Sequence, residues 1–89
     1  MLKGSNYDDA LNELVEVEEL EKTLYGDTSL QLGKTYKVIG TLNIIQGRSQ
    51  EAKEYLNKAA KIFEIRGSMK LLKEVKEKIK LLNLSIKQA

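Results

Sequence analysis

The carboxylates near the N-terminus are the densest group of side chains in this sequence that could perform chemistry. The group consists of Glu13, Glu16, Glu18, Glu19 and Glu21. Two carboxylates act as acid and base only where different environments push their pKa values apart, and they hold a cation only where a turn of the chain wraps around it. Their spacing instead favours a solvated helix face. We therefore expect surface groups, with no catalytic residue and no metal site.

The composition of the 89-residue chain excludes most other enzymatic chemistry. The absence of Cys removes thiolate nucleophiles, disulfides and zinc sites that need sulfur, and the absence of His removes the commonest general base. A phosphate-binding glycine loop would have to follow a strand, and no segment alternates in the way that is typical of strands. The sequence therefore predicts a protein that is not an enzyme, with no cofactor and no small-molecule substrate.

Lysines are concentrated in residues 70–80, which hold Lys70, Lys73, Lys76, Lys78 and Lys80. Such a basic helix could bind the phosphates of a nucleic acid or an anionic lipid surface. The segment has no aromatic residue to stack on bases, and Glu74 and Glu77 partly neutralise it. We therefore favour the polar face of a terminal helix over nucleic acid or membrane binding.

The small formal net charge of +2 conceals a strong asymmetry. Residues 1–29 carry eight acidic and two basic groups, a net charge of −6, whereas residues 30–89 carry five acidic and 13 basic groups, a net charge of +8. Opposite ends of one small domain therefore produce opposite electrostatic fields. This opens self-assembly as an alternative function, in which the acidic first helix of one copy meets the basic last helix of another, head to tail.

The sequence contains no evident targeting or membrane-spanning segment. The N-terminus lacks the apolar stretch and cleavage site of a signal peptide, and no apolar run approaches the roughly 20 residues that cross a bilayer. We therefore expect a soluble, intracellular protein, with the cytoplasm as its default location.

Glycines followed by capping residues divide the chain into four predicted helices. A glycine takes the left-handed turn that ends a helix, and the polar residue after it accepts hydrogen bonds from the N–H groups that begin the next. Apolar residues recur every three or four positions between these glycines. The glycines at positions 4, 26, 47 and 67 thus predict helices over 7–25, 29–46, 50–66 and 69–87. Asn6 and Asp9 resemble a capping box at the first of them. The short loops make neighbours antiparallel, and the expected fold class is all-α.

The first and third predicted helices look like copies of one unit. A shift of 42 residues superimposes their small and apolar positions pairwise: Ala10 and Ala52, Leu14 and Leu56, Val17 and Ala59, Leu20 and Ile62.

A characteristic series of residues runs from 36 to 67. A tyrosine is followed by an Ile-Gly pair, a turn glycine, a Glu-Ala pair, and then a large and a small residue. This series resembles the helix pair of the tetratricopeptide repeat, and the longer spacing, with Leu24-Tyr25-Gly26 at the end of the preceding helix, is similar to the repeats of kinesin light chains. The resemblance assigns eight residues to packing within the repeat: Tyr36, Ile39, Gly40, Gly47, Ala52, Leu56, Ala59 and Phe63. Phe63 is expected to fill space between the helices.

The resemblance implies a short α-α superhelix of stacked antiparallel hairpins. In it, residues 5–26 are the second helix of a truncated repeat, residues 29–67 are one complete repeat, and residues 68–89 are the polar capping helix that such arrays need. Residues 1–89 then form a single domain. A plain four-helix bundle could use the same residue types and is the alternative architecture.

In this family the first helix of each pair lines a concave groove that holds a peptide or a helix of a partner. The resemblance therefore implies a protein–protein interaction module, a scaffold or adaptor, with a cytoskeletal association left open. The groove residues that it assigns are Lys34, Lys37, Thr41 and Ile44, with Ile45 and Arg48 at the edge. Lys37 matches a lysine with which chaperone-binding members hold a terminal carboxylate, but Thr41 replaces the Asn of that clamp, so a complete clamp is not expected.

The last predicted helix offers a second route to a homo-oligomer. Its main apolar residues have the 3-4 spacing of a coiled-coil seam: Leu72, Val75, Ile79, Leu82 and Ile86. They cover barely two heptads, and packing on the preceding helix explains them equally well. Leu71, Leu81 and Leu84 lie outside this stripe and indicate a further contact, with another chain or with a missing repeat.

Overall fold

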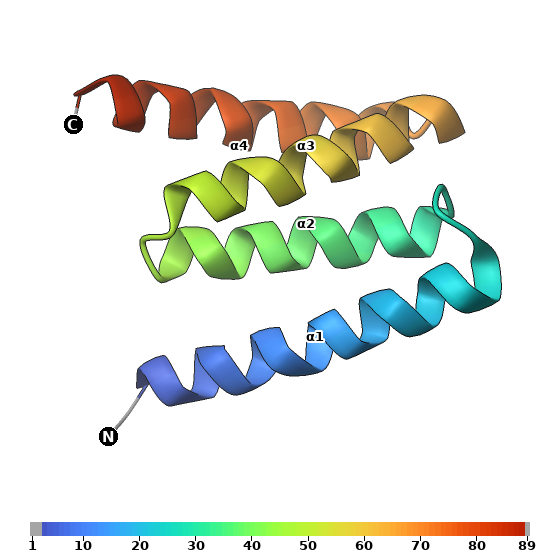
Figure 1. Ribbon diagram of the computed structural model, residues 1–89. Helices are drawn as coiled ribbons and strands as arrows, with labels where there is room; N and C mark the ends of the chain where they lie inside the picture. Colours follow the sequence, from blue (N-terminus) through green and yellow to red (C-terminus); the bar gives the residue numbers. More distant parts are fainter. Residues whose placement is uncertain (1–2, 89) are drawn as a thin grey trace.

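The protein is a row of four α-helices in the computed structural model, which describes the backbone of residues 3–88 and the side chains of residues 7–84 (Figure 1). The helices are α1 (Lys3–Tyr25), α2 (Leu30–Ile45), α3 (Ser49–Arg66) and α4 (Met69–Gln88). Each packs against the next in chain order, so α1 and α4 form the two ends of the row (Figure 1). A closed bundle would pack α1 on α4. The expected all-α architecture of stacked hairpins is confirmed.

The predicted boundaries hold within one residue except at the start of the chain. There α1 begins at Lys3 instead of residue 7, so the backbone is already helical at Gly4 and Asn6. The capping box expected from Asn6 and Asp9 is therefore wrong. A single glycine costs a helix only about 1 kcal/mol relative to Ala, which by itself does not end a helix.

Three glycine turns end the first three helices. Gly26, Gly47 and Gly67 have φ angles of +90°, +80° and +72°, which is the left-handed conformation expected of a glycine after a helix. Ser29 caps α2, because its side-chain oxygen accepts the N–H of Leu32 at 3.1 Å. The start of α3 differs from expectation, since its N-cap residue is Arg48 and no side chain caps it.

The core lies among α2, α3 and α4. Its largest fully buried side chains are Phe63, Leu32, Ile39, Leu56 and Val75. α1 contributes less, since Leu11 is the only buried apolar residue among its described side chains. The hydrophobic centre of the protein therefore depends on the complete α2–α3 hairpin and on α4, while α1 is attached from one side.

Two glycines inside α2 let α3 approach closely. A methyl group on Gly40 would lie 2.8 Å from Leu56 Cγ and 3.3 Å from the Ala52 carbonyl oxygen. A methyl group on Gly33 would lie 2.8 Å from Phe63 Cε1. These distances to carbon are shorter than carbon atoms tolerate. Gly40 therefore provides space for Leu56, and Gly33 provides space for the Phe63 ring and for Ile62, whose Cγ2 would lie 2.9 Å from the added methyl group.

Candidate partner-binding surface

α2 and α4 face each other across a shallow cleft of about 300 Å³, which we call the α2–α4 cleft. It is lined by Lys37, Glu74, Glu77, Lys78 and Leu81. Lys37 Nζ donates a hydrogen bond to Glu74 Oε1 at 2.9 Å and forms an ion pair across the cleft. That hydrogen bond, together with the positive charge of Lys37, holds the pKa of Glu74 below its ordinary value of 4.5.

The outward face of α2 borders this cleft. It presents two exposed apolar side chains, Val38 and Ile45, beside the exposed Lys34 and the partly exposed Thr41. Val38 lies four residues after Lys34 and seven before Ile45, so all three share one side of the helix. We call these four residues the α2 face. Together with the cleft it forms a mixed apolar and basic surface.

The residues predicted to line the groove do not all lie on this surface. Lys34, Lys37, Thr41 and Ile45 do, whereas Ile44 is half-buried against the core. Arg48 lies elsewhere, because its guanidinium is 3.6 Å from Asp8 of α1. It also lines a separate hollow with Leu11 and Val15 of α1.

The sequence assigned neither Val38 nor any residue of α4 to this surface, although Leu81 was expected to make a further contact. Val38 could have been found from its helical spacing to Lys34 and Ile45. The α4 residues could not, because only the packing of α4 on α3 brings Glu74, Glu77, Lys78 and Leu81 opposite α2.

The Thr41 and Lys37 side chains are already engaged within the protein. The Thr41 hydroxyl donates to the backbone carbonyl of Lys37 at 2.9 Å, and the Lys37 ammonium is paired with Glu74. A terminal carboxylate would have to displace Glu74 to reach Lys37. The absence of a complete carboxylate clamp stays a prediction.

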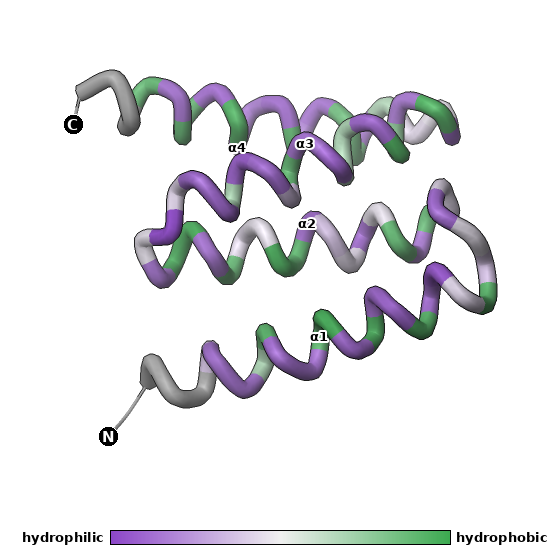
Figure 2. Tube along the Cα trace, in the orientation of Figure 1, coloured by the Kyte–Doolittle hydropathy of each residue, from purple (hydrophilic) through white to green (hydrophobic). Residues whose placement is uncertain are grey.

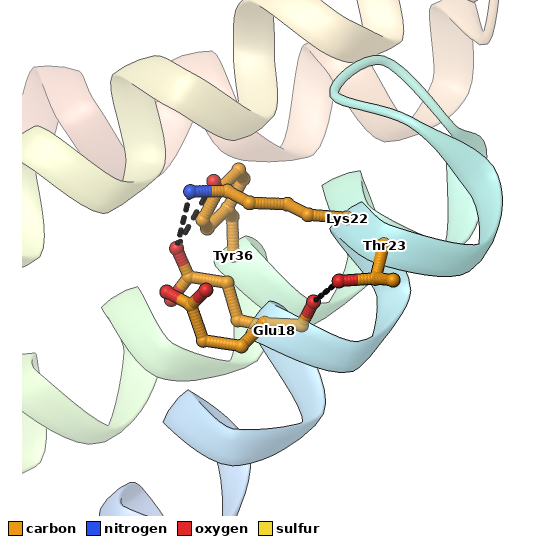
Figure 3. A network of polar contacts seen from close by, with 5 residues as sticks. Glu18, Lys22, Thr23 and Tyr36 are labelled. Carbon is orange, nitrogen blue, oxygen red and sulfur yellow. Dashed lines mark hydrogen bonds and ion pairs between the residues drawn. The ribbon is translucent and has the colours of Figure 1, made fainter.

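A buried carboxylate joins α1 to α2 (Figure 3). Glu18 is only 6% exposed. Its Oε2 accepts the Tyr36 hydroxyl at 3.2 Å and lies 3.2 Å from the Lys22 ammonium. Burial, and then the negative charge of Glu18, raise the pKa of Tyr36, while the hydrogen bond to Glu18 raises the pKa of Lys22.

The acidic cluster is therefore not wholly a solvated face. Glu18 is buried, and Glu21 accepts the Thr35 hydroxyl at 2.7 Å. Both lie on the side of α1 that contacts α2, a side that the charge pattern alone does not identify. Their role is to hold α1 in place. Within the described side chains no group of three or more acidic residues converges as a metal site.

The lysines of α4 are divided between two sides of the helix. Lys73, Lys76 and Lys80 line a hollow with Met69 and Leu72. Lys70 and Lys78 lie on the other side, close enough to Glu74 to help lower its pKa. The helix therefore does not offer one continuous basic stripe. No described helix is long and apolar enough to cross a membrane.

The 3-4 stripe of α4 is occupied within the chain. Leu72, Val75 and Leu82 are buried, and Ile79 packs against the same core, so α3 covers the stripe. Ile86 lies outside the described side chains. This stripe is therefore not available to form a coiled coil with another chain. The exposed leucines of α4 are Leu81 and Leu84.

We predict that Lys37→Met raises the pKa of Glu74 back toward 4.5, as measured by NMR titration of the side-chain carboxyl. Because the pKa of Glu74 is depressed in the folded state, the contact stabilises the protein above pH 4.5, and this contribution is lost as the pH falls through the folded-state pKa. Lys34→Met removes the same charge from the same helix and serves as the control. A Glu74 pKa that responds equally to both changes would contradict the pairing.

Comparison with known proteins gives one match. A family model described as tetratricopeptide repeat matches residues 2–65, which include nearly all of α1, α2 and α3. No curated protein and no solved structure matches the chain significantly. The expected likeness to the repeats of kinesin light chains stays a prediction.

Proposed function

This chain belongs to the tetratricopeptide repeat family, whose repeats generally mediate protein–protein interaction, and from that premise we propose that it binds a helix or peptide of another protein on the α2 face and the α2–α4 cleft. In this proposal residues 5–26 are the second helix of an incomplete repeat, residues 29–67 a complete repeat, and residues 68–89 the cap. The observation that carries the proposal is the set of exposed apolar side chains on this surface: Val38, Ile45 and Leu81. The cytoplasmic location expected from the sequence stays a prediction.

The surroundings of these apolar side chains favour a partner of particular chemistry. Lys34 lies beside Val38 on the α2 face, and Lys37 and Lys78 line the cleft. A partner helix with an apolar stripe and acidic flanks would cover the apolar side chains and pair with the lysines. Buried apolar contacts would then supply most of the affinity, and the charges would guide association. The role is that of a scaffold or adaptor, which performs no reaction.

We expect Ile45→Asp and Val38→Asp each to weaken partner binding at least about tenfold, because a carboxylate would be desolvated inside an apolar contact. The probe is a peptide enriched from a random 15-residue display library on the immobilised protein, with affinity measured by fluorescence anisotropy. Ile65→Asp is the matched control, since Ile65 is similarly exposed but lies on α3. Circular dichroism verifies that all variants keep their helix content.

Two outcomes would overturn this function. Enriched peptides that bind Ile45→Asp and Val38→Asp as tightly as the unaltered protein would exclude the α2 face. Failure to enrich any peptide would exclude the surface as a peptide-binding site.

A further inference from the structure

One side of α1 is apolar and uncovered. Leu20 and Leu24 are 58% and 60% exposed, and Val17 is exposed beside them. Hydrophobic positions recur along the coloured part of this helix, from residue 7 to its end (Figure 2). Under the 42-residue shift Val17 and Leu20 correspond to Ala59 and Ile62 of α3, which are buried. The strip Val17–Leu20–Leu24 of α1 therefore corresponds to the side of α3 that packs against α2. On α1, no described helix covers this strip.

The opposite end of the row carries a hollow that has apolar lining, like this strip, and lysines that could pair with the acidic residues beside the strip. It has a volume of about 280 Å³ and lies along α4, with the exposed Met69 and the 5% exposed Leu72 as apolar lining, Lys73, Lys76 and Lys80 as basic lining, and Glu77 as its one acidic residue. α3 packs on the other side of α4, through Val75 and Leu82. The two ends of the row thus expose one apolar strip with acidic neighbours and one apolar hollow with basic neighbours.

The α2–α3 hairpin gives the register in which two such helices pack. Tyr36 of α2 lies against Tyr55 of α3, with ring centroids 5.8 Å apart, and Lys58 Nζ lies 5.6 Å from the centre of the Tyr36 ring. Gly33 and Gly40 lie one turn away on either side of this contact and leave space for side chains of α3.

α4 repeats the placement of α2 with an offset of 40 residues. Thr35 bonds to α1, and Ile39 lines a hollow with α1 residues; the corresponding Val75 and Ile79 pack with α3. On α2 the residues that face α3 are Gly33, Tyr36 and Gly40. With the same offset, the corresponding residues of α4 are Lys73, Lys76 and Lys80. The long lysine side chains keep a helix from approaching α4 as closely as α3 approaches α2. An acidic helix that packs at a somewhat larger distance would pair with these lysines.

α1 has acidic residues at the matching places. Under the 42-residue shift Glu13 stands in the position of Tyr55 and Glu16 in the position of Lys58. Both glutamates are exposed, as is Lys76. If α1 of one copy packed on α4 of another in the α2–α3 register, Lys76 would face Glu13 and Glu16. The aromatic contact of the hairpin would be replaced by an ion pair of opposite charges.

We propose that the protein associates with a second copy of itself, head to tail, with the Val17–Leu20–Leu24 strip of one copy on the Met69–Leu72 hollow of the next. The helical row continues across this junction in the α2–α3 register. The contact shares only Glu77 with the α2–α4 cleft and no residue with the α2 face, so variants at Leu20, Met69 and Val38 test the two proposals separately. Because it joins two different surfaces it is heterologous, and it builds closed rings or open chains of copies.

Light scattering at two salt concentrations tests the proposal first. We expect a mass that rises with protein concentration at about 20 mM NaCl and falls toward that of the monomer at about 500 mM, because the ion pairs are screened. Leu20→Asp and Lys76→Glu should each weaken association at least about tenfold. Ile65→Asp is the control for an exposed apolar residue outside the junction and should leave association unchanged.

A mixing experiment then identifies the geometry. Leu20→Asp blocks the strip and Met69→Asp blocks the hollow, so each variant alone is expected to stay monomeric. Mixed together they retain one intact strip and one intact hollow and should form a 1:1 dimer that grows no further. A mixture that stays monomeric would overturn the head-to-tail contact. Association that survives Met69→Asp would overturn it in favour of an α1–α1 contact. An unaltered protein that is monomeric at both salt concentrations would overturn it outright.

Discussion

Phe63→Ala is expected to reduce the free energy of unfolding by about 3–5 kcal/mol. Phe63 is the largest fully buried side chain, and its ring edge lies over Gly33. A domain of this length has only about 4–13 kcal/mol of stability in total. Urea denaturation followed by circular dichroism should therefore find a protein close to the limit of folding at room temperature.

The same site offers a test that does not depend on the size of that loss. In the unaltered protein a methyl group on Gly33 would collide with Phe63 and, at 2.9 Å, with Ile62 Cγ2. Phe63→Ala removes the first collision and leaves space into which the Ile62 side chain can turn. Gly33→Ala should therefore cost less stability in the Phe63→Ala background than in the unaltered protein. We expect a coupling free energy of about 1–2 kcal/mol in the double-mutant cycle. Strict additivity would mean that Gly33 and Phe63 do not share this space.

Gly40→Val is expected to reduce the free energy of unfolding by about 2–3 kcal/mol. The new side chain would meet Leu56, which is fully buried and has no room to move, and the Ala52 carbonyl oxygen beyond it. The helix pair must separate to admit it, and the loss of stability corresponds to a fall in Tm of about 8–24 °C. Thermal unfolding monitored by circular dichroism measures the change.

The control for Gly40→Val is Gln31→Val, which introduces the same β-branched residue at an exposed position of the same helix. It should change stability by no more than about 0.5 kcal/mol. Val has a higher helix propensity than Gly, so a Gly40→Val variant that is no less stable than Gln31→Val would mean that α2 and α3 do not approach closely at Gly40.

The number, direction and approximate ends of the helices could be predicted because their signals are local. The glycines at 26, 47 and 67 require a left-handed turn wherever they follow a helix. The 3-4 spacing of apolar residues identifies the buried side of a helix without reference to any partner. The predicted start of α1 was wrong because a glycine near a chain end is a weak signal on its own.

The surfaces available to partners could be predicted only in part. Lys34 and Ile45 were placed correctly on α2 because they follow the helical period. Arg48 lies after the end of α2, where the period no longer applies, and its side chain pairs with Asp8 of α1. Glu18 has the same charge and neighbours as the exposed glutamates, and only the position of Tyr36 on the next helix explains its burial.

The sequence by itself determined that this is an all-α repeat protein with an acidic beginning, a basic end and neither Cys nor His for chemistry. Only the tertiary structure decided which apolar stripes are covered. The stripes on α1 and α4 are equally regular, yet α3 covers the one on α4, while Leu20 and Leu24 of α1 are bare. The reason is that periodicity is a property of one helix, whereas burial needs a second helix, and an open row leaves its two end helices with one neighbour each.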